Sequence, residues 1–272
     1  MPSILGSYYW ACSHTEGCDS QQIPILKADY PLVLATDLDG TFLGGTDQMR
    51  AEFYQYLQRQ RDRLLLIFVT GRDLGFIEQL CENPDFPCPD YIIGDVGTTI
   101  VHGETFEPLH EVQNWVAERW NNANDRIKAM LANEPSLTLQ PVATERRVSY
   151  YYNPEELQPS TVQKVVDAGF DCILSADIYF DVMPRGIAKG PTLLKLMEVL
   201  HINREAVIPA GDTLNDLSLF ETGLKAIAVG NSEPKLVEKI KAMDNVYHSP
   251  HPGVAGIWDG INAYGKHQEL AL

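Results

Sequence analysis

The sequence predicts an α/β fold with two parts: a Rossmann-like, doubly wound core on a parallel sheet, and an inserted α+β cap domain. Three observations carry this prediction. Short, continuous apolar runs alternate with helical stretches, as expected for parallel strands that are covered on both faces. Polar motifs follow several of these runs, and the alternation breaks off near residue 105 and returns after Met183. We therefore expect the core at 31–104 and 183–272, and the cap at 105–182.

The first half of the core begins with the apolar run LVLATDL, which predicts a buried strand over 32–38. A second buried strand is predicted at 64–69 (LLLIFV) and a third from 91 onward. Helical stretches at 47–62 and 74–80 separate them. After the cap, the same alternation predicts helices at 191–201 and 233–242, and strands at 206–210 and 226–229.

The cap segment has a more exposed composition. It starts with a long polar stretch that predicts one helix over 111–133. An aromatic strand is expected at 147–152, a helix at 155–168, and short strands at 172–174 and 178–182. This mixture predicts a smaller α+β domain.

Composition excludes several classes of protein. The chain has 272 residues, of which 44% are hydrophobic, so a core is easily built and global disorder is excluded. It carries 37 acidic and 21 basic residues, a net charge of −16 without a basic block, so no nucleic-acid partner is expected. No apolar run approaches the ~18 residues that span a bilayer, so no membrane partner is expected. A phosphate site would need positive charge of its own.

The five cysteines are an odd number and widely spread. The first residues show neither a basic start nor a long apolar stretch, so no signal peptide is expected, and a reducing cytoplasmic location is predicted. Cys12, His14 and Cys18 offer three metal ligands without a fourth. We interpret residues 1–30 as a loosely docked N-terminal arm, whose role stays open.

The first motif, Asp37-Leu38-Asp39-Gly40-Thr41, follows the first predicted strand. Two carboxylates two positions apart project to one side, repel each other and favour a cation. One could attack an electrophile while the other serves as acid and base. An ordinary turn at a strand end is the alternative.

Two further motifs offer groups to a phosphate. Thr70-Gly71-Arg72 follows the second strand, where a hydroxyl and a backbone amide can hold a phosphate oxygen. Lys189 stands just ahead of a predicted helix and offers a point charge to phosphate or to a carboxylate. Taken alone, Thr70-Gly71-Arg72 is also typical of a plain turn with a helix cap. Lys189, taken alone, could equally be an ordinary solvated lysine.

The fourth motif, Gly211-Asp212-Thr213-Leu214-Asn215-Asp216, follows another strand. Asn215 and Asp216 share a side with Asp212 if a helix starts there. Two acids and an amide at a strand end predict a site for a hard cation, with a capped helix start as the alternative. All four motifs lie at the carboxyl ends of predicted parallel strands or next to them, where ligands bind in open α/β sheets.

In order and spacing, these motifs resemble the haloacid dehalogenase superfamily of phosphatases. The resemblance covers the chain from about Leu32 to its end, and the insert lies where that family carries its large cap. Three softer matches resemble the sucrose-phosphate phosphatase branch: Asp95–Ile100, Arg147–Tyr151, and Asp181–Pro184 followed by Lys189-Gly190.

The resemblance implies roles for individual residues. Asp37 would be the nucleophile and Asp39 the acid and base, with Thr70 and Lys189 completing the catalytic set. Mg²⁺ would be the cofactor. Its ligands would come from Asp37, Asp39 (through the carbonyl), Asp212 and Asp216, the last lying nearby to orient metal waters or Lys189. The phosphorylated substrate would contact Thr41, Gly71, Arg72 and Asn215.

The resemblance also implies Mg²⁺-dependent hydrolysis of a sugar monophosphate, such as sucrose 6-phosphate or a similar disaccharide or glycoside phosphate, through an aspartyl-phosphate. Three alternatives stay open: a phosphatase of another osmolyte such as a glycosyl-3-phosphoglycerate, a phosphohexomutase, and a non-catalytic binding protein. The cap residues that contact the sugar and the oligomeric state are not predicted.

Overall fold

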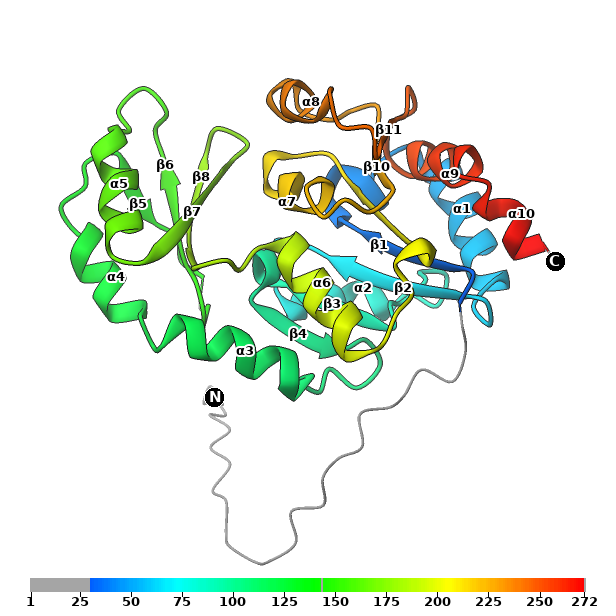
Figure 1. Cartoon of the computed structure of the whole chain (residues 1–272), viewed down its shortest axis with the longest axis horizontal. Helices are drawn as coiled ribbons and strands as arrows, with labels where there is room; N and C mark the ends of the chain where they lie inside the picture. The colour runs from blue at the N-terminus through cyan, green and yellow to red at the C-terminus, as the bar shows by residue number, and fades with distance from the viewer. Residues whose placement is uncertain (1–29, 143, 272) are drawn as a thin grey trace, which may run out of the picture.

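The computed structural model describes residues 30–142 and 144–271, so the predicted N-terminal arm with Cys12, His14 and Cys18 lies outside the described residues. The described chain contains a seven-stranded sheet and a separate four-stranded sheet, with helices packed against both (Figure 1). The predicted α/β class is confirmed.

The large sheet has the order β11-β10-β9-β1-β2-β3-β4. Neighbouring strands are parallel except β4, which pairs antiparallel with β3. β1 and β2 are buried along their whole length, which explains their continuous apolar runs. The strands are β1 (Leu32–Thr36), β2 (Leu64–Val69), β3 (Tyr91–Gly94), β4 (Thr99–His102), β9 (Val207–Gly211), β10 (Ala226–Ala228) and β11 (Val246–His248).

Helices cover both faces of this sheet, so the core is doubly wound as predicted. Side chains of β1 alternate between the two faces: Leu32 and Leu34 belong to one hydrophobic cluster, and Val33 and Ala35 to the other. The first cluster includes residues of α1 (Asp47–Arg59), α2 (Leu74–Cys81), α9 (Gly253–Ala263) and α10 (Lys266–Ala271). The second includes residues of α3 (His110–Trp120), α6 (Lys189–Val199) and α7 (Leu217–Phe220), while α8 (Pro234–Ile240) packs in a small cluster beside β10.

The small sheet is antiparallel and has the order β5-β6-β8-β7. Two helices cover one of its faces, where Ile127, Val165 and Phe180 form part of a hydrophobic cluster of its own. The elements are β5 (Leu137–Leu139), β6 (Val148–Tyr152), β7 (Phe170–Ser175), β8 (Tyr179–Pro184), α4 (Asn124–Leu131) and α5 (Pro159–Asp167). The limits 105 and 182 of the cap stay a prediction.

The helix α3 joins the two parts. Its residues Val112 and Val116 are buried in the core cluster, whereas Trp120 at its end belongs to the cap cluster. A single helix over 111–133 was expected, but α3 ends at Trp120 and α4 begins at Asn124. Asn121 and Asn122 adopt left-handed backbone conformations (φ 49° and 51°), which asparagine tolerates and which end a helix.

Two of the cysteines form a disulfide that was not predicted. Cys81, at the end of α2, is bonded to Cys88, and their Cα atoms lie 5.5 Å apart. Cys172 is free. Among the described helices, none has both the length and the apolar character needed to cross a membrane. The cytoplasmic location stays a prediction.

Candidate active site

The sequence motifs meet at one edge of the large sheet. Because β9, β1 and β2 are neighbours in the sheet, the residues that follow them are brought together. Asp37 follows β1, Thr70 follows β2 and Asp212 follows β9, while Lys189 is the first residue of α6.

The ammonium group of Lys189 lies at the centre of this site. The side chain is completely buried, and its three donors all have acceptors. Nζ donates to Oδ1 of Asp37 at 2.7 Å, to Oδ1 of Asn215 at 2.8 Å and to Oδ1 of Asp216 at 2.5 Å. Lys189 therefore fixes Asp37 from the first motif against two residues of the fourth.

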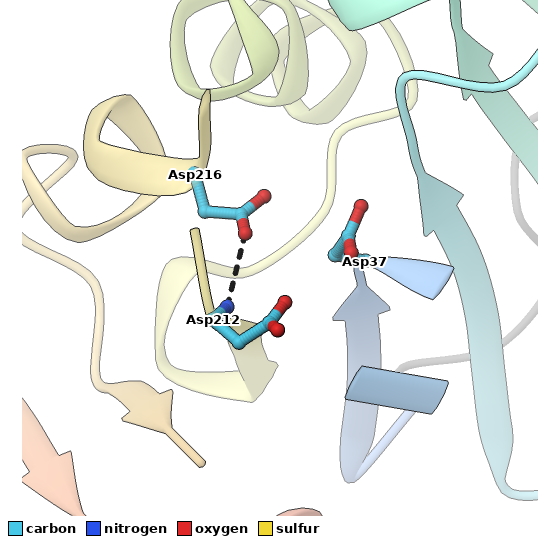
Figure 2. A group of neighbouring side chains, drawn as sticks. All are labelled: Asp37, Asp212 and Asp216. Carbon is cyan, nitrogen blue, oxygen red and sulfur yellow. Dashed lines mark hydrogen bonds between the residues drawn. The ribbon is translucent and has the colours of Figure 1, made fainter. Parts of the chain in front are cut away.

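Three carboxylates converge beside this lysine, and we name Asp37, Asp212 and Asp216 the acidic triad. One oxygen from each lies within 4.8 Å of the others, and Figure 2 shows the three side chains turned toward a common space. Asp216 is oriented by the backbone N–H groups of Asp212 and Thr213, each 3.0 Å from its Oδ2. Asp212 accepts a hydrogen bond from the Thr41 hydroxyl at 2.9 Å. Asp212 and Asp216 are thus held in place by hydrogen bonds from residues of the first and fourth motifs.

The electrostatics of the triad favour a cation. Burial raises the pKa of Asp37 to about 7, although the nearby Lys189 lowers it. Burial, together with the charges of Asp216 and Asp37, raises the pKa of Asp212 to about 8. Burial alone would lower the pKa of Lys189, but the Asp216 and Asp37 carboxylates outweigh it and raise that pKa. One ammonium faces three carboxylates, and carboxylate oxygens are the ligands that Mg²⁺ prefers, so the triad fits this metal.

The side chain of Asp39 points elsewhere. Its two oxygens accept hydrogen bonds from Nε and Nη2 of Arg72, both at 2.8 Å, and about half of the carboxylate-bearing side chain is exposed. Within the described residues, this carboxylate does not belong to the acidic triad. Thr70 is buried, and its hydroxyl accepts from the backbone N–H of Arg72 at 3.1 Å. The expected role of Asp39 in metal binding therefore rests on its carbonyl group and stays a prediction.

Glycine is required at position 40. Its backbone φ is +80°, a conformation that disfavours a side chain. A Cβ atom here would lie 2.1 Å from Oδ2 of Asp212. The missing side chain allows the first motif to approach the fourth, which brings Asp37 and Asp212 together.

Asn231 is a site residue that was not predicted. Its Nδ2 donates to the Gly40 carbonyl at 3.0 Å and to Oδ2 of Asp212 at 3.2 Å. Its Oδ1 accepts from the backbone N–H of Gly253 at 2.8 Å. The sequence did contain a signal for this residue: Asn231 comes shortly after β10 and Gly230, at the same edge of the sheet as the other motifs. Arg147, from the cap, also reaches this edge, by contacts that the local sequence gives no means of predicting.

Comparison with known proteins gives a family match over nearly all of the described residues. A model of the sucrose-6F-phosphate phosphohydrolase family matches residues 30–265. A glucosylglycerol-phosphate synthase from Pseudomonas anguilliseptica is 37% identical over 235 residues, which are 86% of this chain and 31% of the synthase. A mannosylfructose-phosphate phosphatase from Agrobacterium fabrum is 27% identical over 246 residues, which are 86% of this chain and 96% of that protein. The chain thus spans about a third of the first relative and nearly all of the second.

A solved structure shares the fold. The sucrose-phosphatase from Synechocystis, in complex with sucrose and phosphate, superposes with a TM-score of 0.78 at 24% sequence identity. The match covers 87% of this chain and 98% of the other. Since the family match spans both the sheet that carries the acidic triad and the inserted cap, this chain belongs to the sucrose-6F-phosphate phosphohydrolase family, within the haloacid dehalogenase-like phosphatases.

Proposed function

We propose that this chain hydrolyses the phosphate ester of a glycoside, with Mg²⁺ as cofactor and Asp37 as nucleophile. The observation that carries the proposal is the buried pair of Asp37 and Lys189 beside the acidic triad. This arrangement supplies a fixed carboxylate and positive charge at the same point. Together with a bound Mg²⁺, Lys189 would offset the three carboxylates of the triad and supply the positive charge that a phosphate site in an acidic protein needs.

The reaction uses this chain's residues in two steps. A carboxylate oxygen of Asp37 attacks phosphorus, and the bond between phosphorus and the sugar oxygen breaks, which leaves an aspartyl-phosphate. The leaving oxygen takes a proton from Asp39, and Asp39 then removes a proton from the water that hydrolyses the aspartyl-phosphate. Mg²⁺, when bound by the acidic triad and the Asp39 carbonyl, would stabilise negative charge on the phosphoryl oxygens. The Thr70 hydroxyl and the Asn215 side-chain amide bind the remaining oxygens, and Lys189 joins them when its Nζ exchanges one of its three present acceptors for a phosphoryl oxygen.

Arg72 must release Asp39 before the first step. Both oxygens of Asp39 accept hydrogen bonds from Arg72, so neither oxygen is available to the leaving group until this pair opens. The guanidinium of Arg72 matches a phosphate group as well as a carboxylate. Arrival of the substrate phosphate can therefore draw Arg72 away and free Asp39 for its role.

The names of the relatives support a glycoside as the leaving group. They include sucrose-phosphatases, a mannosylfructose-phosphate phosphatase and a glucosylglycerol-phosphate synthase, beside a putative HAD-like hydrolase whose name states no substrate. Each of the first three names concerns a phosphorylated compound in which one sugar is joined to another sugar or to glycerol. We propose sucrose 6-phosphate or a similar glycoside phosphate as substrate, a small-molecule partner, and a cytoplasmic location.

The test is a screen for phosphate release from phosphorylated glycosides in the presence of Mg²⁺. The panel contains sucrose 6-phosphate, mannosylfructose phosphate, glucosylglycerol phosphate, a glycosyl-3-phosphoglycerate and p-nitrophenyl phosphate. We expect one glycoside phosphate to exceed the aryl phosphate in kcat/KM by at least about 100-fold. In a separate incubation with a sugar bisphosphate, isomerised sugar monophosphate in place of free phosphate would show a mutase. Binding of a compound of the panel without turnover of any would show a non-catalytic protein.

We expect the affinity for Mg²⁺ to rise with pH, because protons and the metal compete for the same oxygens. The raised pKa values of Asp37 (about 7) and Asp212 (about 8) mean that protons remain bound below these values and must leave before the cation binds. Calorimetry at about pH 6, 7 and 8 should show the Mg²⁺ dissociation constant falling by at least about tenfold over this range. Asp212→Asn is the matched variant and should bind Mg²⁺ more weakly at every pH. A constant that did not change with pH would contradict the prediction.

A further inference from the structure

Arg147 lies outside all four sequence motifs, in the segment of the cap that leads into β6. Its side chain is 10% exposed and belongs to no hydrophobic cluster. In a buried position an arginine needs partners for its charge, and those of Arg147 come from both parts of the molecule.

In the cap, Nη1 of Arg147 donates to Oδ1 of Asp181 at 2.9 Å, and the Ser149 hydroxyl donates to the same oxygen at 2.5 Å. In the core, Nη2 of Arg147 donates to Oδ1 of Asp95 at 3.1 Å and to the carbonyl of Gly71 at 3.2 Å. One guanidinium thus joins two carboxylates, one from each part, whose side chains are only 6% and 13% exposed.

The core partners belong to two segments, which we name the Thr70 loop (residues 70–72) and the Asp95 turn (residues 95–97). Two backbone hydrogen bonds join them. The N–H of Asp95 donates to the Arg72 carbonyl at 3.1 Å, and the N–H of Val96 donates to the Thr70 carbonyl at 3.0 Å. Val96 has a φ of +59°, which is strained for a β-branched residue, so the turn depends on its neighbours for its shape.

The Asp95 turn also supports the backbone of Lys189. A Cβ atom at Gly97 would lie 2.7 Å from the carbonyl carbon of Ala188 and 3.0 Å from the N atom of Lys189. The Thr192 hydroxyl donates to the Gly97 carbonyl at 2.9 Å. The Asp95 turn, which Arg147 contacts, therefore lies against both the Thr70 loop and the start of α6, where Lys189 stands.

We propose that Arg147 is a positioning residue: it ties the docked position of the cap to the placement of Thr70 and Lys189, the two groups assigned to the phosphoryl oxygens. This inference rests on the proposed phosphatase activity. Removal of the guanidinium leaves Asp95 and Asp181 buried, close together and without their shared cation. The cap then moves away, and the Asp95 turn loses a contact that holds its strained shape.

The variant Arg147→Met tests this, with p-nitrophenyl phosphate and the best glycoside phosphate as substrates. Because the displaced groups bind the phosphoryl group itself, kcat should fall for both substrates, by about 100-fold for a displacement of about 1 Å. A loss confined to the glycoside phosphate would place the role of Arg147 in the cap alone and overturn the proposal. If the wild type hydrolyses the aryl phosphate but no glycoside phosphate, the proposed substrate class fails while this test stands.

The control is Lys235→Met. Lys235, in α8, forms a second ion pair between cap and core, with Asp177, and the two side chains are 62% and 53% exposed. Water screens such a pair, so its loss should change kcat by less than about threefold. Equal losses in Lys235→Met and Arg147→Met would contradict a specific role for Arg147.

Amide hydrogen exchange gives a readout without turnover. In Arg147→Met, peptides that contain 70–72 and 95–97 should exchange faster, while the cap strands β7 and β8 keep their protection. General loss of protection in the cap, or no change at the two core segments, would overturn the proposal. Asp95→Asn approaches the same link from the core and leaves the cap pair of Arg147 and Asp181 intact. It should reproduce the loss in kcat even if Arg147→Met does not fold, and full activity in Asp95→Asn would also refute the inference.

Discussion

Replacing Asp37 with Asn should lower kcat for phosphate release by at least about 10⁴-fold, the scale expected when a covalent nucleophile is removed. The amide has nearly the same shape as the carboxylate but does not attack phosphorus. The carbonyl oxygen of this amide could still accept the hydrogen bond that Lys189 now donates to Asp37 at 2.7 Å, so the fold should survive. The measurement is phosphate release under saturating substrate and Mg²⁺, together with acid trapping of the phosphorylated protein.

The matched control for this variant is Asp39→Asn. Loss of the proton donor should be nearly as damaging for a glycoside phosphate, whose leaving oxygen needs a proton, but far milder for p-nitrophenyl phosphate, whose leaving group departs as the anion. Asp37→Asn should abolish turnover of both and leave no trapped phosphoprotein. Substantial activity in Asp37→Asn would exclude Asp37 as the nucleophile.

Lys189→Met should produce the second largest effect, on both activity and stability. Asp37 and Asp216 would remain buried without their shared cation, which costs about 3–5 kcal/mol in comparable buried pairs. The loss of charge at the phosphoryl group should lower kcat by at least about 10³-fold. Chemical denaturation gives the free energy of unfolding, and phosphate release gives kcat.

Two further variants separate these effects. Lys241→Met changes a surface lysine that pairs with Glu238, the two side chains being 60% and 71% exposed, and should leave both quantities nearly unchanged. The double variant Lys189→Met/Asp216→Asn removes one of the stranded charges and should regain part of the stability without regaining activity. Loss of stability without loss of kcat in Lys189→Met would show that Lys189 is structural only.

Much of the core could be predicted because the signals are local. The runs that form β1 and β2 are continuously apolar because both faces of these strands are buried. Once the strands are parallel neighbours, the residues that follow them must meet, so the proximity of Asp37 and Asp212 follows from the topology. The sequence also allowed a capped helix start at this motif. Thr213 and Asp216 do form a capping box, at the start of a short helical turn.

The partners of individual side chains could not be predicted in the same way. The side chain of Asp39 contacts Arg72 because of the rotamer that it adopts. The alternation of strands and helices in the sequence carries no information on such rotamers. Arg147 gains its core partners, Asp95 and the Gly71 carbonyl, only when the cap docks on the core, and Gly71 lies 76 positions away in the sequence. The break between α3 and α4 depends on the left-handed backbone at Asn121, in a stretch whose polar composition otherwise favours one helix.

The shared helix α3 limits how the cap could be exchanged between relatives. Val112 and Val116 fill the core cluster under the large sheet, while Trp120 fills the cap cluster. A chimera joined at residue 105 would replace both valines with residues fitted to another core and leave cavities or overpacking beside β4 and α6. A chimera joined after Asn122 keeps all of α3 with its own sheet. The cap of this chain is therefore transferable as a unit only from the end of α3 onward, and caps should be exchanged between such proteins at that joint.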